Sequence, residues 1–219
     1  ILHRLLQQLH AQGVGFVTTS NVPPDELYLH GLQRESFLPC IALLRRTCHV
    51  VELLGAQDYR LRTLCAAATY LSPLSAENEA RLAERFRSLS GQAPEAGHLE
   101  INGRAIPVRG CANGVAWFGF GALCEGPRSA ADYIEIARDF HTVLISGAPR
   151  LDDAQQDAAR RFVYLVDELY DRQVNLLLNA EAPPPALYAG QRLQREFERT
   201  GSRLIEMQST EYLAREHRP

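Results

Sequence analysis

The sequence predicts an α/β protein, in which strands and helices alternate along the chain. Short apolar runs typical of buried strands lie at Val14–Thr19, Cys48–Leu54, His141–Ser146 and Val174–Leu178. Segments of helical length separate the runs within each half of the chain. Parallel strands need crossovers of this length, so we expect strands joined in this way to pair in parallel.

The composition excludes several classes of function. The chain has 219 residues and a formal net charge of −3, which gives no electrostatic reason to expect nucleic acid as a partner. All 23 basic residues are arginine, and a P-loop needs a lysine on the β- and γ-phosphates, so the sequence contains no P-loop. No apolar run approaches the length of a membrane-spanning helix.

The five cysteines do not predict a metal site. They include no C-x-x-C pair, so the spacing of a zinc site is absent, and their number is odd. We expect thiols in the core of a protein from a reducing cytosol, with no disulfide framework and no bound metal.

A polar strand end followed by paired prolines is the main candidate for a functional site. The first strand ends in Ser20 and Asn21, and Pro23 and Pro24 then forbid further strand pairing and suit the first turn of a helix. Open α/β sheets place ligand groups at the carboxyl ends of their strands. Arg34 follows as a permanent cation suited to phosphate oxygens. On spacing alone, an ordinary strand-to-helix turn explains the same residues.

The first part of the chain is predicted as helix, strand, helix, strand. An amphipathic helix covers Ile1–Gln12, and Gly13 is its natural C-terminal cap. The second helix lies between Pro24 and Arg46, with a break near Pro39.

The middle of the chain is predicted as a helix, a loop and a small β-rich insertion. Ser75 caps a helix that reaches Ser88, and a Gly/Pro/Ala-rich connection follows. Asn102-Gly103 lies between alternating apolar residues, which predicts a hairpin over Leu99–Val108 with a type I′ turn. The insertion also contains the apolar strand Val115–Phe120.

The last part of the chain is predicted as a second α/β unit. Its helices cover Ser129–Asp139, a segment capped by Asp152 that ends near Arg172, and a polar segment from Leu193 to near Arg215, weakened at Gly201.

Two segments of the chain align without gaps. Val14–Tyr28 and Val174–Tyr188 both begin with Val, place two prolines at the same positions and end in Leu-Tyr. A duplicated strand–loop–helix unit is one explanation, and two unrelated units that share turn chemistry is the other. In the second segment, Ala180 and Glu181 stand opposite Ser20 and Asn21.

The sequence also resembles a known family over nearly its whole length. The string GVGFVTTSNVPPDELYLHGLQRESFLPCI is similar to the segment after Walker B in the ZapE cell-division ATPases and in their mitochondrial relatives, the Afg-type ATPases. The similarity continues in order through DYRLRTL, LSPL, DYI, FHTV, ARRF, LVDE and SRLIEMQS. The match is therefore specific to this family rather than to P-loop proteins at large.

The resemblance implies roles for two residues. Asn21 matches the sensor-1 position of AAA-type ATPases, where it would contact the attacking water or the γ-phosphate. The alternative is that Asn21 caps the following helix. Arg34 looks like the arginine finger of the family, although Ser36 stands where a second arginine is usual, and its alternative is an ion pair with Glu26 or Glu35.

Three further residues are expected near the nucleotide. Ser20 lies beside Asn21, Arg60 begins the lid, and Arg203 would be a sensor-2-like contact. For the two arginines, ordinary salt bridges are the alternative.

The resemblance also implies a domain organisation. Residues 1–56 would be the C-terminal part of an AAA-type P-loop NTPase core, with a partial parallel sheet. Residues 57–97 would be a lid-like helical region, and residues 98–219 the β insertion and the second α/β unit. Because the sequence begins within a helix pattern and without methionine, we expect a fragment whose upstream part holds the P-loop and Walker B.

The function that the resemblance implies is ATP hydrolysis in cell division. ATP and Mg²⁺ would be bound mainly by the upstream part, in a homo-oligomer that acts on FtsZ-like polymers at a cytoplasmic division site. It also allows peripheral association with the inner membrane. The alternatives are a non-catalytic interaction module and a mitochondrial-type ATPase in inner-membrane protein quality control.

Overall fold

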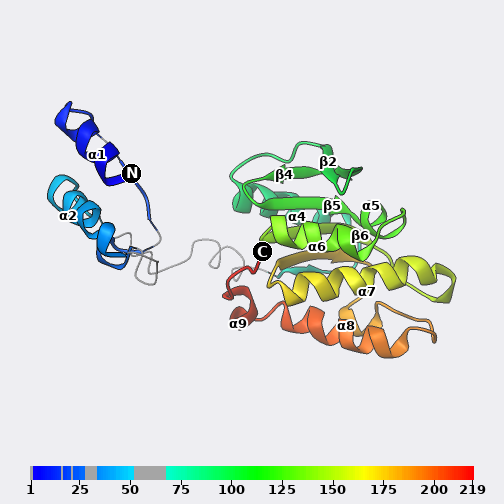
Figure 1. Cartoon of the computed structure of the whole chain (residues 1–219). Helices are drawn as coiled ribbons and strands as arrows, with labels where there is room; N and C mark the ends of the chain where they lie inside the picture. Colours follow the sequence, from blue (N-terminus) through cyan, green and yellow to red (C-terminus); the bar gives the residue numbers. More distant parts are fainter. Residues whose placement is uncertain (1, 16, 21, 28–33, 52–67) are drawn as a thin grey trace. The chain divides into compact units, whose positions relative to one another are not determined.

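The computed structural model describes residues 2–15, 17–20, 22–27, 34–51 and 68–219 (Figure 1). The chain forms two compact units, Ile1–Ala56 and Gln57–Pro219. The combination of helices with a mostly parallel sheet confirms the predicted α/β class. Among the residues described, no helix is both long and apolar enough to cross a membrane.

The described residues of the first unit form two α-helices and two short 3-10 helices. These are α1 (Leu2–Ala11), η1 (Pro24–Glu26), η2 (Arg34–Ser36) and α2 (Leu38–Thr47). α1 agrees with the predicted first helix, and Gly13 follows it with φ +75°. Within the range predicted for the second helix, Pro24 to Arg46, the described residues form η1, η2 and most of α2, and residues 28–33 lie outside the described part. Pro39 does not break α2 but lies in its first turn, where its missing N–H has no intrahelical partner to lose.

The two strands predicted in the first unit are wrong as far as the structure describes them. Residues 14, 15 and 17–20 are not in a strand, and the side chain of Val17 is 98% exposed. Residues 48–51 are also not in a strand, and Val50 and Val51 are exposed; residues 52–54 lie outside the described part. Apolar strands of this kind are stable only when neighbouring strands and covering helices bury them, and the described residues of this unit supply neither.

The second unit is built on a five-stranded sheet. Its strands are β1 (Tyr70–Leu71), β4 (Gly110–Ala112), β5 (Val115–Gly119), β6 (Thr142–Ala148) and β7 (Asn175–Ala180). The spatial order is β1-β7-β6-β5-β4, in which the first four strands run parallel and β4 is antiparallel to β5. The parallel sheet that the described residues form thus lies in this unit, whereas their part of residues 1–56 contains no strand of the partial sheet expected there.

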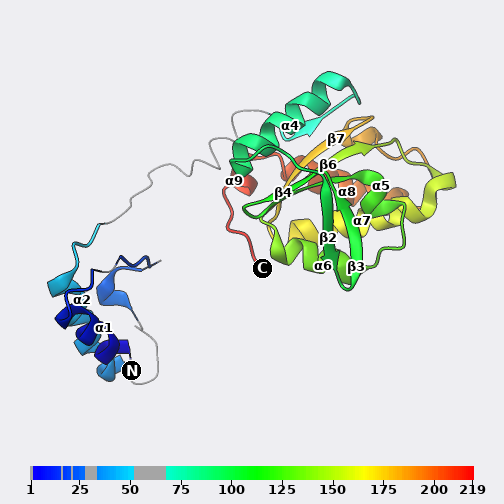
Figure 2. The ribbon, with the colours of Figure 1, turned by 90° about the horizontal axis from the view of Figure 1, so that it is seen from above.

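Helices cover both faces of this sheet (Figure 2). On one face lies α4 (Ala76–Ser90), and on the other lie α5 (Phe120–Cys124), α6 (Ala130–Asp139) and α7 (Gln156–Asp171), with α8 (Gln194–Glu206) packed on α7. Successive side chains of β6 point to opposite faces of the sheet and so belong to two separate core clusters. Leu144 packs with Leu82 and Phe86 of α4, whereas Val143 and Ile145 belong to the cluster on the opposite face.

The hairpin prediction is confirmed. β2 (Gly97–Ile101) pairs antiparallel with β3 (Arg104–Val108), and Asn102 and Gly103 both have positive φ, of 50° and 71°. These angles are those of a type I′ turn. Arg104 also binds the buried carboxylate of Asp132 over 2.9 Å, which attaches the hairpin to the start of α6.

The strand predicted as part of the β insertion belongs to the main sheet. β5 pairs in parallel with β6, with Val115 opposite Thr142, and four of its five residues are buried. Its apolar run of VAWF reflects this central position, because strands inside a parallel sheet are buried on both faces. α4, which lies within the predicted lid-like region, covers this sheet; a lid function for it remains a prediction.

Helix caps agree with the sequence in three places. Ser75 accepts a hydrogen bond from Asn78 N at the start of α4, Ser129 and Asp132 form a capping box on α6, and Asp152 accepts from Ala154 N in η3 (Asp153–Gln155). Met207 ends α8, so the final helix is shorter than predicted, and α9 (Thr210–Leu213) follows with its own cap at Ser209.

α8 continues without a break through Gly201. A Cβ atom at this position would lie 3.4 Å from the carbonyl oxygen of Pro184 in η4 (Pro184–Ala186), which is an ordinary van der Waals contact.

The two aligned segments share a turn but not a strand. Pro23 has φ −61° and ψ 157°, and Pro183 has φ −64° and ψ 158°. Each proline starts a three-residue 3-10 helix, η1 or η4. Only the second segment contains a strand among its described residues. The two segments therefore share the geometry of their turns, and a duplication and an independent origin remain the two explanations.

Candidate functional site

The predicted strand-end pair is only partly described. Ser20 is exposed, and its hydroxyl accepts a hydrogen bond from Val22 N over 3.2 Å. Asn21 lies outside the described residues, so its sensor role stays a prediction. The η1 turn has Pro23 at its N-cap position, and the alternative that Asn21 caps this turn also lies outside the described residues.

Arg34 begins η2 and is held by the backbone of η1. Its Nη2 donates to the carbonyl oxygen of Asp25 over 2.7 Å, whereas the carboxylate of Asp25 pairs with Arg45 over 3.1 Å. The Nε atom of Arg34 is buried and has no hydrogen-bond partner. An unpartnered N–H on a permanent cation is a free donor of the kind that phosphate oxygens accept from, and the role of Arg34 at a nucleotide stays a prediction.

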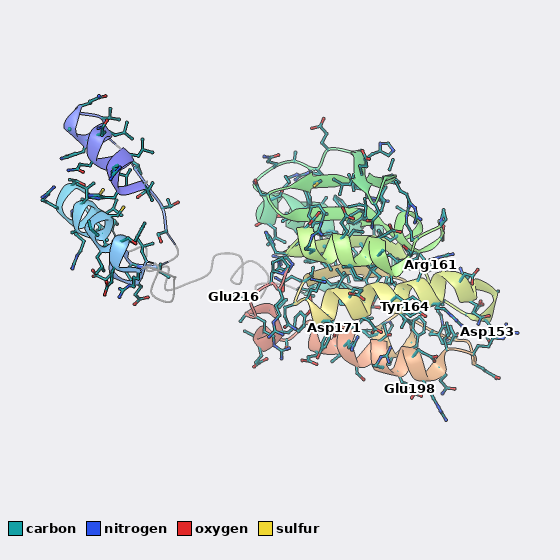
Figure 3. All side chains as sticks on the ribbon, viewed as in Figure 1. Asp153, Arg161, Tyr164, Asp171, Glu198 and Glu216 are labelled. Atoms are coloured by element: carbon teal, nitrogen blue, oxygen red, sulfur yellow. The ribbon has the colours of Figure 1, made fainter. Side chains whose placement is uncertain are left out.

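Arg203 is held in an ion-pair network between α8 and α7. Its guanidinium donates to Asp167, lies 3.6 Å from the Asp171 carboxylate at the C-terminal end of α7 (Figure 3), and stacks 4.6 Å from the centre of the Tyr170 ring. Arg203 therefore forms the salt bridges that were the alternative to a sensor-2-like contact. Arg60 lies outside the described residues, and Arg203 and Arg34 belong to different units.

A polar cluster that the sequence analysis missed lies at the carboxyl edge of the second unit's sheet. Glu79, in the first turns of α4, receives a hydrogen bond from Ser146 Oγ over 2.9 Å and one from Asn179 Nδ2 over 3.0 Å. Ser146 and Asn179 lie near the carboxyl ends of β6 and β7. The helix after β1 and the helix after β7 lie on opposite sides of the sheet, and α/β proteins bind ligands at such a switch point.

Two further residues complete this cluster, which we call the Glu79 cluster (Glu79, Arg109, Trp117, Ser146 and Asn179). The indole Nε1 of Trp117 donates to Ser146 Oγ over 2.7 Å. Arg109 donates to Glu79 Oε1, and its guanidinium lies 5.7 Å from the centre of the Trp117 ring.

Burial divides the cluster into a fixed part and a solvent-facing part. Trp117, Ser146 and Asn179 are at most 4% exposed. The side chain of Glu79 is 32% exposed and that of Arg109 50%. Asn179 Nδ2 donates to Glu79, whereas Asn179 Oδ1 is buried and has no hydrogen-bond partner. A buried orphan acceptor is uncommon and costs free energy, so it marks a position where a further donor would be accommodated.

The cluster suits a cation rather than a phosphate. α4 carries Glu77 and Glu79 in its first turn, and its N-cap Ser75 already serves Asn78 N. The helix N-terminus that holds phosphate in nucleotide-binding sheets is therefore neutralised by its own side chains.

A groove of about 520 Å³ lies elsewhere in the second unit, between η4 and α8. Pro184, Pro185, Tyr188, Phe197 and Ile205 supply its apolar lining, and Glu198 its acidic residue. Tyr188 stacks on Phe197 at 4.4 Å, and its hydroxyl donates to Asp153 over 2.6 Å. This hydrogen bond, together with those from Gln191 N and Arg192 N, lowers the pKa of Asp153.

Within the described ranges, no group of three or more His, Cys, Asp or Glu side chains could hold a metal ion.

Comparison with known proteins identifies the family. A family model described as AFG1-like ATPase matches residues 1–216. The chain is 45% identical over 218 residues to the cell division protein ZapE of Escherichia coli K12, which covers 99% of this chain and 58% of ZapE. It is 38% identical over 190 residues to lactation elevated protein 1 homolog B of Danio rerio, covering 84% of this chain and 37% of that protein.

A third relative is an uncharacterised protein of Schizosaccharomyces pombe, 36% identical over 191 residues that cover 86% of this chain and 42% of that protein. No solved structure matches. The chain thus spans less than two thirds of the length of each of these relatives. Because the family model extends over nearly every residue, the chain belongs to the AFG1-like ATPase family.

Proposed function

We propose that this chain is the part of a ZapE-type ATPase that senses and completes the nucleotide site. The observation that carries the proposal is the state of Arg34, a permanent cation with a buried, unpartnered Nε, in a chain that belongs to the AFG1-like ATPase family. Asn21 would orient the attacking water and Arg34 would stabilise charge on the transferred phosphoryl group. Ser20 and Arg60 would flank the same nucleotide.

Arg203 contributes to the nucleotide site in this proposal only if its side chain changes position. A sensor-2-like contact requires its guanidinium to turn from Asp167 and Asp171 toward the nucleotide. The ionic network explains its position without any ligand, so we assign Arg203 first to the attachment of α8 to α7.

ATP is the expected nucleotide, with Mg²⁺ held by residues outside the described ranges. Arg34 is on a short 3-10 helix beside α2 and pairs with a backbone carbonyl rather than a carboxylate. Its charge is therefore not neutralised by Asp25, whose carboxylate binds Arg45. We propose that Arg34 reaches the nucleotide of a neighbouring subunit, which requires a homo-oligomer.

The likeness to ZapE, which is a cell division protein, supports a proposal for the partner and the location. We propose action on an FtsZ-like division polymer at a cytoplasmic division site. Co-sedimentation of the complete protein with FtsZ polymers, with and without ATP, tests this part. Absence of the protein from the polymer pellet under both conditions would remove the proposed partner and leave the ATPase assignment standing.

ATP turnover of the complete protein tests the residue roles. We expect Asn21→Ala to lower turnover about a hundredfold and Arg34→Ala about a thousandfold. Arg46→Ala is the matched control, because it removes an exposed arginine from the same unit and should leave turnover within about twofold of wild type. Wild-type turnover in both site variants would contradict the roles of Asn21 and Arg34.

A further inference from the structure

The Glu79 carboxylate is positioned without the help of Arg109. Ser146 Oγ donates to Oε1 and Asn179 Nδ2 donates to Oε2, and both donors are 2% exposed. Ser146 is itself fixed by the indole N–H of Trp117. Removal of Arg109 would therefore leave a preorganised carboxylate beside an aromatic ring.

Arg109 reaches this carboxylate from the surface. Its backbone N–H is fixed to Trp117 O over 2.7 Å, whereas its side chain is half exposed and passes near Gly119 at the end of β5. Ion pairs at this exposure contribute little free energy, since water competes for both charges. Arg109 is thus a ligand of the site that another cation can replace.

The chemistry of the cluster selects a guanidinium group. A planar cation with several N–H donors can bind a carboxylate and lie against an aromatic ring at once, as the Arg109 side chain does with Glu79 and Trp117. Asn179 Oδ1 remains as a buried acceptor that Arg109 does not satisfy. Glu77 in the same helix turn adds negative charge near the site, although its own partner is Arg81.

We propose that the Glu79 cluster is an arginine-recognition site, occupied in this conformation by Arg109 and open to an arginine side chain of a partner protein. Arg109 then acts as an internal competitor, which weakens but does not prevent partner binding. The proposal concerns the second unit alone and is independent of ATP hydrolysis.

Trp117 provides a direct readout, because it is the single tryptophan of the sequence and contacts both Ser146 and Arg109. The experiment titrates N-acetyl-arginine amide into Arg109→Ala while the fluorescence of Trp117 is recorded at constant ionic strength. We expect a saturable change that is about fivefold weaker in affinity in the wild type, where Arg109 competes. The change should be lost in the double variant Glu79→Gln/Arg109→Ala.

Three controls make the titration decisive. Arg81→Ala removes an arginine from a glutamate of the same helix and should behave as the wild type. N-acetyl-lysine amide should bind Arg109→Ala more weakly than the arginine compound. Free L-arginine should bind no more tightly than the capped form if the natural ligand is a protein side chain.

Several results would overturn the proposal. These are no saturable change in folded Arg109→Ala, equal binding of the lysine compound, and binding that survives Glu79→Gln. Clearly tighter binding of free L-arginine than of the capped form would contradict a partner protein and indicate a free amino acid as the ligand. If Arg109→Ala does not fold, Arg109→Gln removes the charge while retaining a donor near Glu79, and the same titration with the same outcomes applies.

Discussion

The hydroxyl group of Ser146 donates a hydrogen bond to Glu79 Oε1 over 2.9 Å. This bond joins the carboxyl end of β6 to the first turns of α4, across 67 residues of sequence. Because Ser146 also accepts from Trp117, one buried hydroxyl connects two strands of the sheet to the helix that covers them. Hydrogen bonds between side chains thus connect the strands to α4 at the carboxyl edge of the sheet.

Loss of the Ser146 hydroxyl should destabilise the second unit. Ser146→Ala leaves the buried indole N–H of Trp117 without an acceptor and removes a donor from Glu79, so we expect a loss of about 1–3 kcal/mol in the free energy of unfolding. Urea denaturation followed by circular dichroism measures it. Ser202→Ala, which removes an exposed hydroxyl from α8, should change the free energy by less than about 0.5 kcal/mol. Equal effects of the two variants would contradict a structural role for the cluster.

Alanine substitutions at two glycines can distinguish the cost of backbone strain from the cost of a steric clash. Gly114 and Gly147 have φ of +74° and +75°, but a Cβ at Gly114 would lie 2.7 Å from His141 Cδ2, whereas Gly147 has open space. Gly147→Ala should cost about 1 kcal/mol for the left-handed backbone alone. Gly114→Ala should cost about 1–3 kcal/mol more, because the His141 ring must move. A thermal melt in which both variants lose the same stability would show that the ring moves freely.

Asp132 should make the stability of the second unit dependent on acidic pH. Burial raises the pKa of its carboxyl group, but hydrogen bonds from Ser129 and Asn102 and the charge of Arg104 outweigh this and lower the pKa below its ordinary value. A lowered folded-state pKa gives stability that is present above the unfolded-state pKa of about 3.9 and is lost as the pH falls through the folded-state value.

Asp132→Asn tests this dependence. We expect the variant to lose about 1–3 kcal/mol near pH 7 and to show a shallower decline in stability below about pH 4 than the wild type. Asp139→Asn alters an exposed carboxylate at the end of the same helix and serves as the control. Identical pH profiles for wild type and Asp132→Asn, measured by urea denaturation, would contradict the assignment.

Two arginines of α8 share the carboxylate of Asp167 but differ in burial. Arg203 is 22% exposed and also contacts Tyr170, whereas Arg199 is 54% exposed. Arg203→Ala should therefore destabilise the protein by about 1–2 kcal/mol, and Arg199→Ala by less than about 0.5 kcal/mol. Loss of ATP turnover in Arg203→Ala at unchanged stability would instead favour the sensor-2-like role.

Local signals in the sequence predicted much of the second unit. Asn102-Gly103 predicted the hairpin, Ser75 predicted the start of α4, and the apolar runs predicted β6 and β7. Each of these elements depends on turn chemistry or periodicity within a few residues. The strands predicted in the first unit failed for the opposite reason. An apolar run becomes a strand only when neighbours pair with it, and pairing is not local.

The Glu79 cluster could not be assembled from the sequence. Glu79 and Asn179 are 100 residues apart, and Glu79 alone has the spacing of an ordinary acidic residue in the first turns of a helix. The usable signal was the polar residue near each strand end, Ser146 in β6 and Asn179 in β7. It is the same signal that pointed to Ser20 and Asn21.

A subunit-mixing experiment tests the central claim most directly, namely that Asn21 and Arg34 complete a nucleotide site across subunits. Complete protein carrying Asn21→Ala is mixed with complete protein carrying Arg34→Ala, and ATP turnover is measured against each variant alone. Mixed oligomers should recover turnover, because an Asn21→Ala subunit supplies Arg34 to the intact site of its neighbour, whereas Arg34→Ala mixed with the double variant should not. Two variants that are each inactive alone and remain inactive when mixed would contradict the account.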